Sequence, residues 1–245
     1  MSGQIPYKRV VLKLSGEFLK GAGDYGIDPD ALAFAAREIT LATAVGVEIA
    51  VVIGAGNIFR GMPASELGMD RGCADTIGML ATLMNSLALR DALHSAGARA
   101  EVLSAIAMTG IVDPFDARRA DVLLETGHVV VLAGGTGHPY FTTDTTAALR
   151  ACEIKAEAVL KGTQVDGVYS ADPAVCREAV RYECISFDEA LSRKLRVMDS
   201  TAFSLCMDNG IPVVVFRFRD AGTLGHILRG DLSAATLVSR GPRGE

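Results

Sequence analysis

Short runs of apolar residues, rich in Val and Ile, alternate along this chain with longer stretches in which apolar residues follow helical spacing. The apolar runs contain few alternating polar residues, which is typical of strands covered on both faces of a sheet. Strand–helix alternation is the pattern of a mostly parallel sheet with helices on both sides. The sequence therefore predicts an α/β protein, a three-layer αβα sandwich, in a single domain over residues 1–245.

The pattern also places the individual elements. Strands are expected at 10–14, 48–53, 99–104, 129–133, 158–162, 213–216 and 236–238. Helices are expected at 29–45, 74–96, 145–152 and 199–209, with a short helix capped by Ser186. Asp28 before Pro29 is typical of a helix start, with an acidic N-cap and Pro at the first helical position.

Composition excludes several classes of function. The net charge of −5 and the absence of Trp argue against a nucleic-acid-binding surface, which normally needs basic side chains and aromatic platforms. The five cysteines form no CxxC pair, which indicates reduced thiols in a cytoplasmic protein. No run of residues is apolar enough to span a membrane. We therefore expect no nucleic-acid partner and no membrane association.

Glycine and hydroxyl residues gather directly after three of the expected strands. The segments read KLSGE after the first strand, GAGNIFRG after the second and GGTGHPYFTTD after the run VVVLA. In open α/β sheets, ligands bind outside the carboxyl ends of the strands. Backbone N–H groups of glycine turns bind phosphate oxygens, so this edge of the sheet is predicted to hold phosphates.

Lys13 is the one charge inside the first apolar run. A buried strand rarely carries a lysine without a partner. Pointing into the turn, Lys13 could neutralise a transferring phosphoryl group while Ser15 and the Gly16 amide contact phosphate oxygens. The alternative is a lysine on an edge strand that reaches solvent.

The second turn offers backbone N–H groups at Gly54, Ala55 and Gly56, and Arg60 can bind a phosphate through two hydrogen bonds. It matches neither the GxxxxGK[ST] phosphate loop nor a dinucleotide GxGxxG. The alternative is a plain strand-to-helix turn with a surface arginine.

The third turn, with five Thr, three Gly and one Asp before a probable helix, is the most informative segment. Thr143 or Asp144 is expected to cap that helix, and a helix N-terminus favours anions. His138 is a candidate general base, but phosphoryl transfer depends mainly on positioning and charge neutralisation.

Together these segments resemble the bacterial UMP kinases of the amino acid kinase superfamily. The matching motifs are KLSGE (13–17), GAGNIFRG (54–61), TGHPYFTTD (136–144), KGTQVDGVYSADP (161–173) and KLRVMD (194–199). The resemblance implies the amino acid kinase fold, with an acceptor-nucleotide half over about residues 1–155 and an ATP-binding half over about 156–245. It implies transfer of the γ-phosphoryl group of ATP to UMP, without a covalent intermediate, in pyrimidine nucleotide synthesis.

The resemblance also implies roles by position. As catalytic residues it implies Lys13, which neutralises the phosphoryl group, and Asp144 and Asp199, which organise Lys13 or the metal ion. The implied ATP contacts are Lys13, Leu14, Ser15, Gly16, Gly56, Arg60, Thr163, Tyr169 and Asp172. The implied UMP contacts are Ala55, Asp75 on the ribose, Thr136, Gly137, His138, Pro139, Tyr140, Phe141, Thr142 and Thr143. The implied GTP effector segment is Gly21, Ala22, Gly23, Asp24, Tyr25 and Gly26, for which a flexible glycine loop is the alternative.

Further implications of the resemblance are Mg²⁺ bound with ATP, GTP as an activator, UTP as an inhibitor, and a homohexamer built as a trimer of dimers. No residue is assigned as a metal ligand. The chain departs from the family pattern at Ala55, where Gly is usual, and at His138, Tyr140 and Glu157. Ala55 is costly if the backbone there needs a positive φ.

Two other functions are open. One is another kinase of the superfamily, acting on acetylglutamate, aspartate or carbamate, which would need different contacts to its acceptor. The other is a non-catalytic storage protein of the molybdenum type, which should have lost Lys13 or the acids.

The long helix after the second turn indicates an oligomer. Between Asp75 and Arg90 it carries no charged residue. A helix that is apolar nearly all round is buried nearly all round, so a second copy of this helix is expected to cover its outer side. Leu83 and Leu87 are the expected contact residues.

Overall fold

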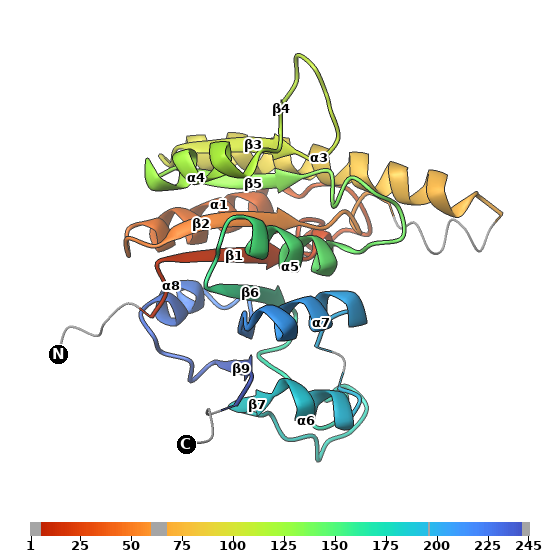
Figure 1. The fold of residues 1–245 in the computed structure, drawn as a ribbon, viewed down its shortest axis with the longest axis vertical. Helices are drawn as coiled ribbons and strands as arrows, with labels where there is room; N and C mark the ends of the chain where they lie inside the picture. Colours follow the sequence, from red (N-terminus) through yellow and green to blue (C-terminus); the bar gives the residue numbers. More distant parts are fainter. Residues whose placement is uncertain (1–5, 60–67, 196, 242–245) are drawn as a thin grey trace.

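A single nine-stranded sheet runs through the whole molecule (Figure 1). The computed structural model describes residues 6–59, 68–195 and 197–241. The strand order is β4-β3-β5-β2-β1-β6-β8-β9-β7, and each neighbouring pair is parallel except β8 with β9. The strands are β1 (Arg9–Leu14), β2 (Glu48–Ile53), β3 (Ala100–Ser104), β4 (Asp113–Pro114), β5 (Val129–Ala133), β6 (Ala158–Thr163), β7 (Cys184–Ser186), β8 (Val213–Arg217) and β9 (Ala235–Ser239).

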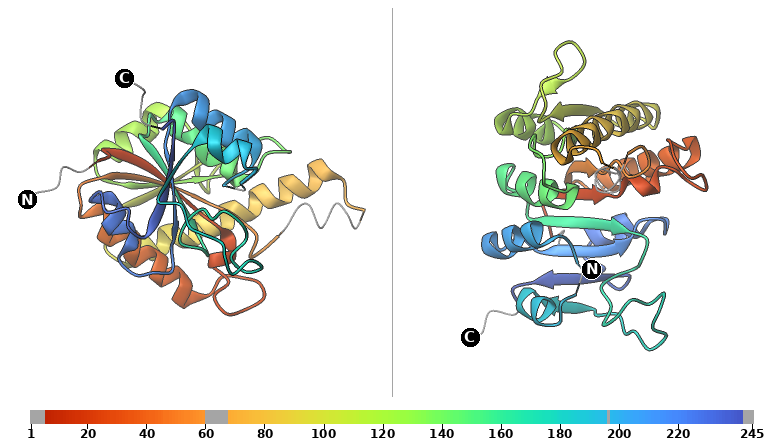
Figure 2. Two further views of the ribbon diagram at one scale, coloured as in Figure 1. Left: turned by 90° about the horizontal axis from the view of Figure 1, so that it is seen from below. Right: turned by 90° about the vertical axis from the view of Figure 1, so that its right-hand side faces the viewer.

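Helices cover both faces of this sheet, as the view along its edge shows (Figure 2). One face is covered by α1 (Pro29–Thr43), α3 (Arg71–Ser95) and α8 (Thr223–Leu228). The other is covered by α4 (Ala117–Glu125), α5 (Thr143–Glu153), α6 (Phe187–Ser192) and α7 (Ser200–Asn209). The predicted three-layer αβα sandwich is confirmed.

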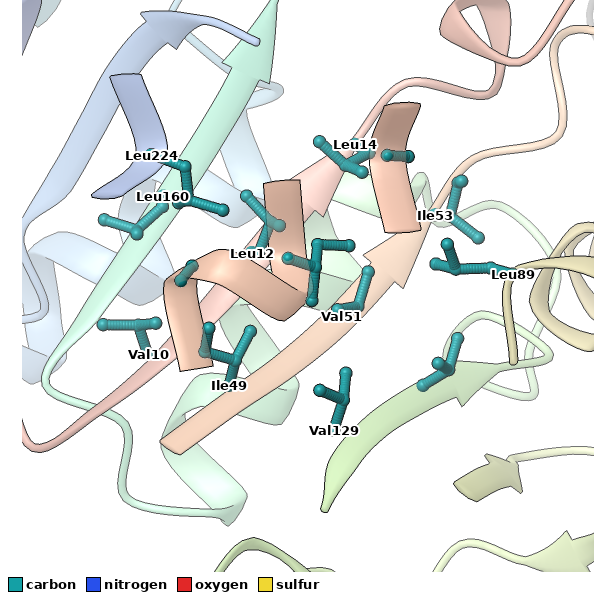
Figure 3. Packing of buried hydrophobic residues seen from close by; sticks show 14 of the residues in the cluster. Val10, Leu12, Leu14, Ile49, Val51, Ile53, Leu89, Val129, Leu160 and Leu224 are labelled. Carbon is teal, nitrogen blue, oxygen red and sulfur yellow. The ribbon is translucent and has the colours of Figure 1, made fainter. Parts of the chain in front are cut away.

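Side chains on the two faces of each central strand pack into two separate hydrophobic cores. Val10, Leu12 and Leu14 of β1 point toward α1, α3 and α8, where Leu12 packs with Val51 and Leu160 of the adjacent strands (Figure 3). Val11 points to the opposite core. Because side chains alternate along a strand, Lys13 lies on the same face as Val11, among α5 and α7. β1 is the middle of the sheet and Lys13 is only 8% exposed, so the edge-strand interpretation of this lysine is wrong.

Helix starts differ from the sequence prediction at three places. The helix expected from Ala74 begins at Arg71, because Asp70 caps it by accepting from the Cys73 N–H. Thr142, rather than Thr143 or Asp144, caps α5, and its hydroxyl oxygen accepts from two N–H groups of the first turn. Asp199 lies outside α7 as its cap. In each case a polar side chain one turn before the apolar pattern satisfies free backbone N–H groups.

Five elements were not predicted: β4, α4, β7, α8 and the short 3-10 helix η1 (Gly16–Phe18). The strands β4 and β7 are too short for an alternating pattern to identify them. Helix α4 had a signal, because Asp116 precedes an amphipathic stretch and caps it by accepting from the Arg119 N–H.

Helix α3 carries its polar residues inward and part of its apolar surface outward. Thr82, Asn85 and Ser86 are buried, whereas Leu80 is 39% exposed and Met84 is 54% exposed. Leu83, expected at an interface, is buried in the core of its own chain, and Leu87 packs against that core. The outward apolar surface of α3 is therefore formed by Leu80 and Met84, not by the predicted pair. Among the residues that the structure describes, none of the helices is long and apolar enough to cross a membrane.

Candidate active site

The site lies where the chain changes direction across the sheet. Strand β1 pairs with β2 on one side and with β6 on the other, so the two halves of the chain diverge from β1. Such a switch point leaves a crevice outside the carboxyl ends of the strands. Leu14 ends β1, Ile53 ends β2 and Thr163 ends β6, which brings the turns after these strands to one edge.

A carboxylate between two lysines occupies this edge. Lys13 of β1 and Lys161 of β6 are partners in the parallel register, so both side chains lie on one face. The Lys13 Nζ is 2.8 Å from Asp144 Oδ1, and the Lys161 Nζ is 2.6 Å from Asp144 Oδ2. Lys161 also donates to the Val197 carbonyl at 2.6 Å. We call Lys13, Asp144 and Lys161 the lysine–aspartate triad; it carries a net charge of +1.

Burial sets the electrostatics of the triad. Burial alone would raise the pKa of the Asp144 carboxyl, but the two ammonium groups beside it outweigh burial and hold the pKa below its usual range. Burial lowers the pKa of Lys161, and the charge of Lys13 adds to the decrease while Asp144 opposes it. The triad is therefore a positively charged group poised at the end of the sheet, in a low-dielectric environment that strengthens its effect on phosphate.

Asp199 supports the triad through helix α5. Its carboxylate accepts hydrogen bonds from the hydroxyls of Thr142 and Thr145, and it caps α7 through the Ala202 N–H. Thr142 is the cap of α5, whose first turn holds Asp144. Asp199 thus joins the starts of α5 and α7. Among the described residues its carboxylate bonds to the two threonines and the Ala202 N–H, whereas the ion pair of Lys13 is with Asp144.

The first two glycine turns touch backbone to backbone. A Cβ at Gly16 would lie 2.4 Å from the Gly54 carbonyl oxygen, so only glycine fits there. Leu14 packs in the core and its carbonyl accepts from the Gly54 N–H at 2.9 Å, so the first turn continues with half-buried Ser15 and buried Gly16. Ala55 does not have a positive φ, so the expected cost of its methyl group is not incurred.

A cavity of about 150 Å³ opens beside these turns. Five expected UMP contacts line it, namely Ala55, Asp75, Phe141, Thr142 and Thr143. Six lining residues were not predicted: Ala74, Gly78, Met79, Thr82, Gly135 and Thr146. The helical spacing of Asp75, Met79 and Thr82 could have indicated a shared face of α3 toward the site.

Asp75 is held in place by two donors on one oxygen. Its Oδ2 accepts from Arg71 Nε at 2.7 Å and from the Tyr140 N–H at 2.8 Å. Tyr140 has a φ of 74°, a left-handed conformation that a residue with a bulky side chain rarely adopts. This conformation presents the Tyr140 N–H to Asp75, and Oδ1 of Asp75 has no partner in the described part of the chain.

The rest of the third turn lies outside the lining of the cavity. The Thr136 hydroxyl accepts from the His138 N–H and donates to the His138 carbonyl, which closes the turn around Gly137 and Pro139. The side chains of His138 and Tyr140 are exposed. Glu157, a departure from the family pattern, lies at the start of β6 and accepts from the Lys8 N–H, away from this edge.

A larger cavity of about 600 Å³ lies on the β6 side. Its lining includes the expected ATP contacts Thr163, Tyr169 and Asp172, together with Lys161 of the triad. The Tyr169 hydroxyl donates to Asp166 at 2.7 Å, and Arg217 and Arg181 pair with the same carboxylate. This volume lies in the range of small-molecule sites.

The expected effector segment forms an exposed loop beside the second turn. Gly21 and Gly26 have φ values of 59° and 90°, and Tyr25 is 85% exposed. The Gly26 N–H donates to the Asn57 carbonyl at 2.7 Å, so the loop is tied to the second turn. Arg60, expected to bind phosphate, lies outside the described residues.

Comparison with known proteins identifies this arrangement. A model of the amino acid kinase family matches residues 8–217. This chain belongs to the amino acid kinase family. The kinase is 51% identical to a uridylate kinase of Zymomonas mobilis over 95% of this chain and 96% of the relative.

Solved structures agree with the sequence comparison. A UMP kinase from Bacillus anthracis matches the kinase with a TM-score of 0.92 at 36% identity, covering 97% of this chain and 98% of that one. A UMP kinase from Ureaplasma parvum matches with a TM-score of 0.89 at 39% identity, covering 95% and 98%. The predicted family and fold are confirmed, and the chain is a phosphotransferase.

Lys161 is the member of the lysine–aspartate triad that sequence reasoning did not assign. It stands near the end of an apolar strand, in the same kind of position as Lys13, and a second buried lysine was the available signal. Its partner could not be inferred, because the contact with Asp144 depends on the strand register and on the position of α5.

We predict that the lowered pKa of Lys161 limits activity at high pH. As pH rises, Lys161 loses its proton before an ordinary lysine does, and the triad loses its surplus positive charge. The rate should therefore fall at a pH below the ordinary lysine pKa of about 10.4. Lys161→Arg, which stays charged, should move this decrease to higher pH, as measured by kcat profiles.

The matched control is Lys8→Arg, at an exposed lysine on the opposite end of the sheet. It should leave the profile unchanged. A decrease at the same pH in Lys161→Arg and in the unmodified kinase would assign it to another group.

Proposed function

We propose that this kinase transfers the γ-phosphoryl group of ATP to UMP, giving ADP and UDP. The observation that carries the proposal is the lysine–aspartate triad at the switch point of the sheet, with one cavity on the β2 side and another on the β6 side. Two sites separated by a positively charged group fit a donor nucleotide and an acceptor nucleotide. The names of the relatives support UMP as the acceptor.

The kinase's own groups supply positioning and charge. In this proposal ATP occupies the larger cavity, with its phosphates on the Ser15–Gly16 turn. UMP occupies the smaller cavity, with its phosphate at Ala55 and the N-terminus of α5. The acceptor phosphate oxygen attacks the γ-phosphorus as its bond to the ADP oxygen breaks, and Lys13 and Lys161 offset the charge on the oxygens in flight.

Asp144 positions both lysines in this scheme and does not act as a base. A carboxylate whose pKa is held below its usual range by two lysines is a poor proton acceptor. A UMP phosphate oxygen is already ionised at neutral pH, so transfer to it needs no general base. His138 is not required for the reaction, and its exposed side chain fits that conclusion.

The metal ion belongs to the ATP substrate in this proposal. Mg²⁺ bridges phosphate oxygens and keeps several waters, so it needs few protein ligands. The described residues contain no group of three His, Cys, Asp or Glu side chains able to hold a metal ion. Both oxygens of Asp144 lie within ion-pair distance of a lysine, and the Asp199 carboxylate accepts hydrogen bonds from Thr142, Thr145 and the Ala202 N–H, which fits positioning roles for both acids.

The two proposed nucleotide sites belong to different halves of the chain. We propose an acceptor half over about residues 1–155 and an ATP half over about 156–245, which meet at β1 and β6. The loop at 21–26 is the proposed GTP effector segment, and UTP is the proposed inhibitor. Function as a cytoplasmic enzyme of pyrimidine nucleotide synthesis is the corresponding cellular proposal.

The decisive test is a coupled ADP-release assay with UMP, CMP, acetylglutamate, aspartate and carbamate as acceptors. We expect turnover with UMP, and Lys13→Met should lower kcat by about a hundredfold or more, because one preorganised charge contact is lost. Turnover with an amino acid or carbamate and not with UMP would favour another kinase of the superfamily. Binding of ATP without turnover on any acceptor would favour a storage role.

A second prediction concerns the ribose of UMP. Oδ1 of Asp75, which has no partner among the described residues, can accept a hydrogen bond from a ribose hydroxyl, so UMP should be a better acceptor than dUMP. Asp75→Asn should reduce this preference and leave the KM for ATP unchanged, because its amide can still accept from the Tyr140 N–H. Equal effects on the ATP and UMP constants would contradict the assignment.

We also propose that a second copy of the chain covers the outer side of α3. Leu80 and Met84 are exposed there on a helix without charges between Asp75 and Arg90, and the outer half of that helix extends beyond the sheet (Figure 1). An isologous pair of these helices gives a dimer, and three such dimers give the proposed hexamer.

Met84→Glu should break this contact, because it places a charge in an apolar interface. Size-exclusion chromatography with light scattering should then give a lower molar mass than the unmodified kinase. Leu41→Glu, at an apolar position on α1 that is at least as exposed as Met84, is the control and should keep the original mass. An unchanged mass in Met84→Glu would place the interface elsewhere.

A further inference from the structure

A pair of buried amides joins the inner side of α3, through Asn85, to the second turn, through Asn57. Asn85 is fully buried and Asn57 is 1% exposed, and each side chain satisfies the other. Asn85 Nδ2 donates to Asn57 Oδ1 at 2.8 Å, and Asn57 Nδ2 donates to Asn85 Oδ1 at 3.0 Å. Each side-chain amide therefore has one N–H available for a further hydrogen bond.

One remaining N–H binds a backbone carbonyl of the second turn, and the other binds a carbonyl of the 21–26 loop beside it. Asn85 donates to the Gly54 carbonyl at 2.7 Å, and Asn57 donates to the Gly26 carbonyl at 2.8 Å. Two carboxamides can donate four hydrogen bonds, and all four are made here. The opposite orientation of Asn85 would put its oxygen against the Gly54 oxygen, so the pair has one satisfactory arrangement.

The Gly54 contact fixes the direction of the next N–H group. In a trans peptide the carbonyl and the following N–H point in opposite directions within one plane. Because Asn85 holds the Gly54 carbonyl toward α3, the Ala55 N–H must point away from α3. That N–H has no acceptor in the described part of the chain, and the Ala55 methyl lines the acceptor cavity.

The Gly54 carbonyl also contacts the first turn, at Gly16, where the proposed ATP phosphates bind. Gly16 packs directly on the Gly54 carbonyl and on Asn57 Oδ1, at distances that exclude a Cβ. A rotation of the Gly54–Ala55 peptide would therefore disturb Gly16 as well as Ala55. The Asn57–Asn85 pair therefore contacts both the first turn, at Gly16, and the second turn, at Gly54.

Taken together, these contacts lead us to infer that Asn85 is a positioning residue for phosphoryl transfer. It acts through Asn57 and the Gly54 carbonyl to orient the amides that bind the donor and acceptor phosphates. The inference rests on the proposed transfer between two nucleotides, and it assigns to the inner side of α3 a role in both sites.

A neighbour on the same helix offers a contrasting case. The Thr82 hydroxyl accepts from the Gly134 N–H at 3.0 Å, so Thr82 holds the start of the third turn, where Gly135 lines the acceptor cavity. Ser86 is as buried as Asn85, but its hydroxyl donates only to the Thr82 carbonyl of the same helix. In this inference Asn85 supports both nucleotide sites, Thr82 supports the acceptor site, and Ser86 bonds only within its own helix.

The test compares Asn85→Ala, Thr82→Val and Ser86→Ala in steady-state kinetics with ATP and UMP. Asn85→Ala should raise the KM for both nucleotides and lower kcat, with kcat/KM reduced by about tenfold to a hundredfold, as expected for misplaced binding groups. Thr82→Val should raise the KM for UMP and leave that for ATP unchanged. Ser86→Ala should match the unmodified kinase in all constants.

A merely structural role has a different signature. Loss of folded protein lowers the apparent kcat but leaves both KM values unchanged, so unchanged KM values in Asn85→Ala would overturn the inference. Asn85→Ser, which retains one donor, should recover part of the lost activity. If Asn85→Ala does not fold, Asn85→Ser is read by the same criterion, with raised KM values for both nucleotides expected.

Calorimetric titration with ATP and with UMP separates this inference from the proposed function. Absence of UMP turnover in the unmodified kinase would count against the function. Weakened binding of both nucleotides in the Asn85 variant, against normal binding in Ser86→Ala, would still support the positioning role. Equal affinities in all three proteins would reject it.

Discussion

The rest of the site depends on one carboxylate that holds two buried lysines together. Three charged groups in a protein interior are expensive to desolvate unless each is paired. Asp144 pairs with both lysines, and the Val197 carbonyl satisfies Lys161 further. The surplus of one positive charge remains. That surplus is the property that a site for transferring phosphoryl groups needs, and neutral or balanced clusters of similar size would lack it.

The surrounding structure can be understood as support for that carboxylate. Thr142 begins α5 and brings Asp144 to the end of the sheet, while Asp199 ties the starts of α5 and α7 together through Thr142 and Thr145. The parallel register of β1 and β6 sets the two lysines side by side. A change in any of these elements would move a charge within a buried cluster, where small displacements have large electrostatic effects.

The sequence predicted the layers, the seven longest strands and the turns of the site, because each depends on local patterns. Apolar runs identify buried strands, and glycine and hydroxyl residues after them identify the turns at the carboxyl edge of the sheet. The triad could be predicted only in part. Lys13 was conspicuous in its strand, but the partnership of Lys161 with Asp144 depends on which strands are neighbours and in which register. The short strands β4 and β7 carry too few residues for any periodicity to appear.

Helix α3 shows the limit of reasoning from apolar patterns most clearly. The lack of charges between Asp75 and Arg90 correctly indicated an unusual helix, yet the pattern alone could not show which side faced inward. The buried side carries polar residues among the apolar ones, and Thr82 and Asn85 reach backbone groups of two active-site turns. An apolar outer surface then follows, because the helix has few other polar residues to present. If a second copy of the chain covers Leu80 and Met84, a displacement of α3 at that interface would be transmitted directly to Gly54 and Gly134. Assembly and the geometry of the phosphate turns would then be linked through a single rigid element.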